Sequence, residues 1–165
     1  MVGDLVITND ANSFLATDSS GFVVLTGVVV PPVPQGAPVQ LFTSWAQDGL
    51  VAAGTPPVNP TVFTVTNGWY ITYFDGYVYN NGGGILPSSV NGMIGIKNTS
   101  TNEFVVPMTP AKRLRHITVW DLDFPSPVYL PPGNYQVLLT PTQHWSNSGG
   151  SNYRGMSAIE GLAIT

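Results

Sequence analysis

The apolar residues of this chain come in short runs, and these runs limit the folds it can adopt more than any other feature. Val, Ile, Phe, Tyr, Trp and Thr dominate each run, and Gly, Pro or Asn interrupts the sequence about every eight to twelve residues. Such spacing is typical of β-sandwiches and β-barrels, whereas apolar residues at helical spacing are nearly absent. The chain is therefore predicted to be all-β, as an antiparallel two-sheet sandwich of jelly-roll type.

The length of the chain suits one domain. With 165 residues it can bury a substantial core, and no internal repeat or separable linker is evident, so residues 1–165 are predicted to form a single β-sandwich domain. The expected strands are 5–8, 13–17, 22–30, 39–45, 61–66, 69–74, 77–80, 93–98, 103–107, 116–122, 134–140 and 156–164.

The aromatic segment 69–80 carries the clearest turn signal. Asp75-Gly76 separates two aromatic runs, and Asp-Gly favours a two-residue type I′ hairpin turn that would place Phe74 opposite Tyr77. Because both faces of this ribbon are aromatic, we expect one face in the core and the other either capped by a loop or offered to a partner. Its interaction candidates are Trp69, Phe74, Tyr77 and Tyr79.

Segment 22–30 is apolar at nearly every position, so both of its faces are expected to be buried. The Pro-rich segment 31–34 could cover it within one subunit, or a neighbouring subunit could cover it in an oligomer. Segment 55–60 is also Pro-rich, and both Pro-rich segments are expected along sheet edges or over the rim, because proline donates no ladder hydrogen bond. The candidates for contact between subunits are Val24, Val28 and Val30.

Two features lie near the C-terminus. Segment 129–139 predicts a core hairpin with a tight Pro-Pro-Gly-Asn turn and with Tyr135, Val137 and Leu139 on one face. Segment 144–154 is rich in Ser, Asn and Gly and predicts an exposed loop that does not pack on its own. Its aromatic, amide and guanidinium groups could bind a glycan, or its aromatics could simply anchor the loop. The binding candidates are Trp145, Asn147, Asn152, Tyr153 and Arg154.

Charge is scarce, since 8% of the residues are charged against about 25% in an average domain. A net charge of −4 argues against binding to nucleic acid or to anionic membranes. Three of the five positive charges lie at Lys112, Arg113 and Arg115, beside His116; this run is either a solvated strand entry or a contact for an acidic patch on a partner. A surface so poor in charge suits a protein that hides much of it in an assembly.

Motifs for catalysis and cofactor binding are absent from the sequence. His116, His144 and the pair Glu103 and Glu160 have no flanking motif, so an enzyme is not expected. No cysteine is present to bind a metal. Asp121-Leu-Asp123 places two carboxylates on one strand face, which could hold a hard cation but is better explained as a strand end that turns polar before Phe124. No cofactor or metal is predicted.

Several of these features together resemble the small β-sandwich proteins of phage and archaeal-virus particles, such as head decoration (cement) proteins and tail-fibre tips. The resemblance is carried by the start at Met1, which is followed directly by folded-looking sequence, by the 129–135 hairpin, by neutral Thr- and Asn-rich strands and by the apolar terminal strand 156–165.

The resemblance implies a structural virion protein that is made in the host cytoplasm without a signal peptide. It implies a homo-oligomer, with a trimer like those of tumour-necrosis-factor or C1q-like proteins favoured, and capsid or other virion proteins as partners. The alternative is a carbohydrate- or receptor-binding module that uses the 144–154 loop.

Overall fold

The computed structural model describes residues 14–17, 23–26, 30–46, 50–51, 55–78, 91–115 and 117–165. The chain divides into two compact units, Met1–Pro32 and Val33–Thr165, which are described separately. The first unit contains an antiparallel pair, β1 (Phe14–Thr17) and β2 (Val23–Thr26). The assignment of 1–165 to one domain stays a prediction.

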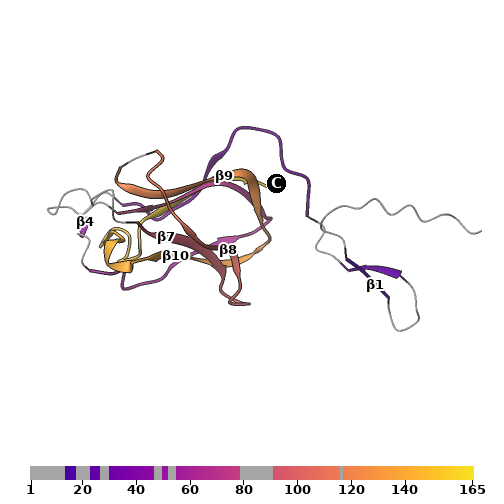
Figure 1. Cartoon of the computed structure of the whole chain (residues 1–165), viewed down its shortest axis with the longest axis horizontal. Helices are drawn as coiled ribbons and strands as arrows, with labels where there is room; N and C mark the ends of the chain where they lie inside the picture. Colours follow the sequence, from indigo (N-terminus) through magenta and orange to yellow (C-terminus); the bar gives the residue numbers. More distant parts are fainter. Residues whose placement is uncertain are drawn as a thin grey trace, which may run out of the picture. The chain divides into compact units, whose positions relative to one another are not determined.

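The second unit contains two four-stranded antiparallel sheets, seen as two layers in Figure 1. The expectation of an all-β, two-sheet antiparallel architecture is confirmed. The first sheet has the order β5 (Thr61–Val65), β10 (Gly133–Thr140), β7 (Met93–Asn98), β8 (Phe104–Pro110). The second has the order β3 (Val39–Thr43), β12 (Ser157–Ala163), β6 (Trp69–Tyr77), β9 (Val119–Leu130). Smaller elements are β4 (Leu50–Val51), β11 (Asn147–Ser148) and a 3-10 turn at Thr142–His144.

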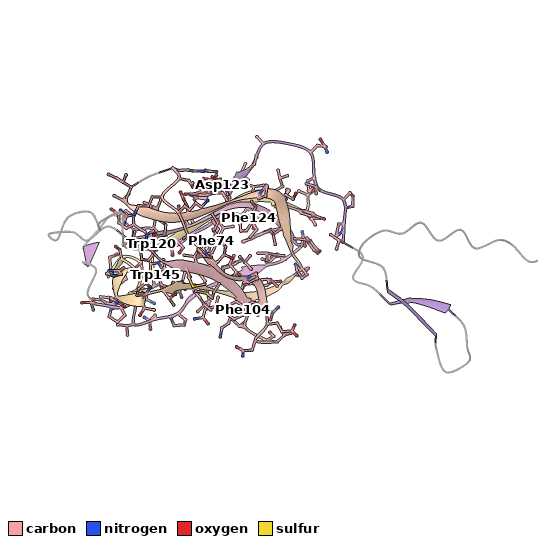
Figure 2. All side chains as sticks on the ribbon, viewed as in Figure 1. Phe74, Phe104, Trp120, Asp123, Phe124 and Trp145 are labelled. Carbon is pink, nitrogen blue, oxygen red and sulfur yellow. The ribbon has the colours of Figure 1, made fainter. Side chains whose placement is uncertain are left out.

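The core lies between these two sheets, where each strand turns alternate side chains inward. Phe74 on β6 and Trp120 on β9 are buried in it, and Figure 2 shows both between the layers. The predicted inward face of β10 is confirmed, since Tyr135, Val137 and Leu139 are all buried. The side chains that do not point into this core lie on the outer faces of the two sheets.

The predicted hairpin turn at Asp75-Gly76 is wrong, because β6 runs through both residues. Gly76 pairs with Ser157 of β12 on one side and with Trp120 of β9 on the other, so ladder partners are available on both sides. The side chain of Asp75 finds donors outside its own strand, and a Cβ at Gly76 would collide with Leu139 of the opposite sheet. Long-range pairing therefore overrides the local turn preference.

The predicted 129–139 hairpin is also wrong, because β9 and β10 belong to different sheets. The connection crosses from one sheet to the other through Pro131 and Pro132, which have no N–H to donate across a hairpin. The Tyr135 hydroxyl instead donates a 2.6 Å hydrogen bond to the Pro131 carbonyl. The strand end expected before Phe124 is wrong as well. β9 continues through Pro125, which is tolerated because β9 is an edge strand.

Candidate functional site

The outer face of the sheet β3-β12-β6-β9 gathers charge around one arginine. The Arg115 guanidinium contacts Glu160 at 2.8 Å and Asp123 at 2.9 Å, and it lies 3.5 Å from the ring centroid of Tyr73. Asp123 lies on β9, in the upper layer of Figure 2. A cavity of about 260 Å³ opens beside this cluster, and its lining residues are Gln40, Thr43, Trp45, Tyr73, Asp75, Arg115, Ala158 and Glu160.

Asp75 is a buried carboxyl that lines this cavity. Its Oδ1 accepts hydrogen bonds from the Ala158 N–H at 2.8 Å and from the Trp45 indole at 3.4 Å, and its Oδ2 lies 3.2 Å from the Tyr73 hydroxyl. Burial raises the pKa of Asp75 to about 6, although these hydrogen bonds act in the opposite direction. Asp75 therefore changes its charge in mildly acidic solution.

Asp121 is fully buried and holds the 111–118 loop, which joins β8 to β9. Its two carboxylate oxygens accept hydrogen bonds from the Leu114 N–H at 2.9 Å and from the Arg115 N–H at 3.0 Å. The backbones of Asp121 and Lys112 also exchange two hydrogen bonds. The carboxylate thus fixes the backbone of a loop on which Lys112, Leu114, Arg115 and Ile117 are exposed.

The Tyr73 hydroxyl joins the two buried carboxyls. It lies 3.2 Å from Asp75 Oδ2 and 3.3 Å from Asp121 Oδ2. Burial, followed by the nearby charges of Asp75 and Asp121, raises the pKa of Tyr73, so this hydroxyl keeps its proton under ordinary conditions. Two carboxyls from neighbouring strands are therefore linked through one phenol.

The prediction that Asp121 and Asp123 share a strand face is confirmed by their pairing with Asp75 and Tyr73, two positions apart on β6. Their contacts are a backbone anchor and an ion pair. Within the described part of the chain, no group of three or more His, Cys, Asp or Glu residues is placed to hold a metal ion. The arrangement is one of hydrogen bonds and ion pairs around a small polar cavity.

The 144–154 loop differs from its prediction because part of it is buried: Trp145, Ser146, Asn147, Ser148 and Ser151. Trp145 is 5% exposed, and its indole donates a 2.9 Å hydrogen bond to the Met156 carbonyl. Ser148 and Ser151 exchange hydrogen bonds between their hydroxyls and backbone N–H groups, so the loop is ordered by its own polar side chains. Trp145 is therefore a packing residue, although it also lines a cavity of about 300 Å³.

Tyr153 is the exposed aromatic of this loop. Its side chain is 48% exposed, and its backbone is left-handed, with φ 54°. The Tyr153 carbonyl accepts hydrogen bonds from the N–H groups of Val58 and Asn59, which hold it in this conformation. Arg154 beside it is half-buried, and its buried Nε has no hydrogen-bond partner.

The other predicted interaction residues are scattered. Phe74 is fully buried, Trp69 stacks on Phe63, Tyr77 packs against Trp45 with the rings tilted, and Val30 is exposed. The side chain of Val24 and residues Val28, Tyr79 and His116 lie outside the described residues. His144 packs edge-on against Trp120. Glu103 lies exposed before β8, whereas Glu160 lies on β12 of the other sheet and pairs with Arg115.

Sequence reasoning missed Trp45, Tyr73, Asp75 and Arg115 as parts of one site. The sequence did contain a usable signal. Tyr73 and Asp75 are two positions apart, as are Asp121 and Asp123, and this spacing places each pair on one face of its strand. The assignment of Asp75 to a turn concealed it.

The sequence matches no known family model and no curated protein, and no solved structure matches the fold. No helix among the described residues is long and apolar enough to cross a membrane. The geometry of the site is thus the basis for the function proposed below.

Proposed function

We propose that this protein is a non-enzymatic structural protein that packs against copies of itself on the surface of a virus particle, as a capsid decoration subunit does. The observation that carries the proposal is the 111–118 loop. Two large apolar side chains on it face solvent, Leu114 at 52% and Ile117 at 60% exposed. Exposed apolar side chains on a loop whose backbone is anchored are typical of a protein–protein contact surface.

The anchorage of the loop supports this proposal. Because Asp121 holds the backbone of Leu114 and Arg115, little conformational entropy remains to be lost when the loop binds. A mobile loop with the same exposed apolar side chains would lose more conformational entropy on binding. A backbone fixed at Leu114 and Arg115 therefore presents the Leu114 side chain in one arrangement that a partner surface can match.

Charge supports a second copy of the chain as the partner. The apolar side chains lie among Lys112, Arg113 and Arg115, while the chain as a whole carries a net charge of −4. A copy of the chain therefore attracts this loop as it approaches. The scarcity of charge elsewhere lowers the cost of covering the remaining surface.

The strand pairing supports a jelly roll and, with it, the resemblance to virion subunits. Among the eight strands of the two sheets, the first pairs with the last (β3 with β12), the second with the seventh (β5 with β10), the third with the sixth (β6 with β9) and the fourth with the fifth (β7 with β8). This is the pairing of one long hairpin folded over into two sheets, which produces the two Greek keys of a jelly roll. A trimer is the assembly that the resemblance favours.

The proposal is tested by the native mass. We expect the wild-type protein to form a symmetric oligomer, and the double variant Leu114→Asp and Ile117→Asp to form a monomer of 17.6 kDa, because two carboxylates would be buried at the contact. Light scattering measures both masses. The matched control is Phe104→Asp, a substitution of an exposed apolar residue on β8 that should leave the mass unchanged. A monomeric wild-type protein, or a double variant with the wild-type mass, would contradict the proposal.

A second candidate function, carbohydrate or receptor binding, is favoured by the exposed ring of Tyr153. The backbone of Tyr153 is hydrogen-bonded to Val58, which borders the 300 Å³ cavity, and exposed aromatic faces stack on sugar rings. Tyr153→Asn keeps a residue that tolerates left-handed backbone, so glycan binding should be lost without a change in melting temperature. A glycan array measures this, with Phe104→Asn as the control for an equally exposed aromatic. If the wild-type protein binds nothing on the array, this candidate fails.

A further inference from the structure

The Tyr73 hydroxyl has one hydrogen and two carboxyl neighbours. It lies within hydrogen-bond distance of Asp75 Oδ2, at 3.2 Å, and of Asp121 Oδ2, at 3.3 Å. An ionised carboxylate can only accept, so the phenol can donate to one of the two but not to both. Both contacts become hydrogen bonds when one carboxyl carries a proton and donates it to the Tyr73 oxygen.

The added proton belongs on Asp75. Both oxygens of Asp121 already accept backbone hydrogen bonds, from Leu114 and Arg115. The donors from Ala158 and Trp45 reach Oδ1 of Asp75, which leaves its Oδ2 able to carry a hydrogen toward Tyr73. Burial also raises the pKa of Asp75 to about 6. The resulting chain runs from the Asp75 O–H to the Tyr73 oxygen, and from the Tyr73 O–H to Asp121.

We propose that this single proton is a pH-dependent latch, which fixes the 111–118 loop in acidic solution and loosens it in neutral solution. Because that loop carries the proposed self-association surface, the biological use of the latch rests on the proposed function. The expected consequence is stronger self-association at acidic pH.

No neighbouring positive charge among the described residues takes over the role of the proton in neutralising Asp75. The charged groups near the Asp75–Tyr73–Asp121 hydrogen bonds are Arg115 on the loop, Asp123 on β9 and Glu160 on β12. Arg115 lies over the ring of Tyr73, but both ends of its guanidinium are bound by the other two carboxylates. Among the described contacts, Asp75 therefore has hydrogen-bond donors but no ion-pair partner.

Loss of the proton weakens the anchor of the loop. With Asp75 ionised, one carboxylate faces the lone pairs of the Tyr73 oxygen, and the two buried negative charges repel each other. Movement of Asp121 to relieve this repulsion disturbs the hydrogen bonds that it accepts from Leu114 and Arg115. The loop thus opens more often as the pH rises through about 6.

Amide hydrogen exchange tests the latch. NMR measures the protection of the Leu114 and Arg115 amides between about pH 5 and pH 8, corrected for intrinsic exchange, with the core amide of Ile96 as reference. In the wild-type protein, protection of both loop amides should fall by about tenfold over this range relative to Ile96, because the range starts about one unit below the Asp75 pKa of about 6.

Two variants separate the latch from general effects of pH. Asp75→Asn keeps an uncharged side chain whose amide can donate to Tyr73, so its loop protection should be high and independent of pH. Tyr73→Phe keeps the ring beneath Arg115 but removes the hydrogen-bonded link, so its loop protection should be low already at acidic pH and should change less with pH than in the wild-type protein.

The native mass of the same samples distinguishes the two proposals. Flat protection in the wild-type protein, or a pH dependence that persists in Asp75→Asn, overturns the latch whatever the mass. Protection that follows pH in a protein that stays monomeric at every pH supports the latch and contradicts the proposed function. An oligomer with flat protection supports the function and contradicts the latch.

Discussion

Replacing Trp145 with alanine is expected to lower the free energy of unfolding by about 3–5 kcal/mol, as large-to-small changes of buried aromatics do. The indole is buried against Gly155, where an added Cβ would collide with the ring, and its N–H is bonded to the Met156 carbonyl. The substitution therefore leaves a cavity and removes one of the two hydrogen bonds that the Met156 carbonyl accepts, the other coming from the Tyr77 N–H. Urea unfolding measures the loss.

The control for this prediction is Tyr153→Asn in the same loop. Its ring is exposed and its left-handed backbone suits asparagine, so the stability should change by less than about 0.5 kcal/mol. A loss below about 1 kcal/mol in Trp145→Ala would show that the indole is not part of the core.

Asp75→Asn is expected to remove a pH dependence of about 3 kcal/mol from the stability of the protein. Folding raises the pKa of Asp75 from 3.8 to about 6. Since the folded pKa is the higher one, the stabilisation by the bound proton is fully present below 3.8 and is lost as the pH rises through about 6. A shift of about two units corresponds to about 3 kcal/mol.

Urea unfolding at several pH values between about 4 and 8 measures this effect as the difference between the variant and the wild-type protein, which cancels the contributions of other groups. The variant should gain stability relative to wild type as the pH rises. The exposed carboxyl of Asp123 provides the control, because Asp123→Asn should keep the wild-type slope. Equal slopes in wild type and Asp75→Asn would contradict the assignment of the raised pKa to Asp75.

Local pattern predicted much of the fold. Residues 93–98 and 134–140 were expected as strands and lie in β7 and β10, because a strand with one buried face shows alternation in its own residues. The inward set of β10 follows from the same period of two. The all-β class follows from the frequent Gly, Pro and Asn between such runs.

The errors arose where the outcome depended on distant residues. Asp75-Gly76 has the composition of a turn, yet β12 and β9 supply ladder partners on both sides and Ala158 supplies a donor to the carboxyl. Trp145 lies in a segment with the composition of an exposed loop, yet Met156 and Gly155 bury its indole. No property of these residues alone reveals such partners.

The sequence by itself determined that this chain is built from short antiparallel strands with little charge, because side-chain alternation and turn residues act over a few neighbouring positions. Only the tertiary structure decided which carboxyls meet. Asp75 and Asp121 are 46 positions apart and become neighbours through the pairing of β6 with β9. The Tyr73 phenol then joins the two carboxyls. Burial between the paired strands raises the pKa of Asp75, which the sequence around it does not predict.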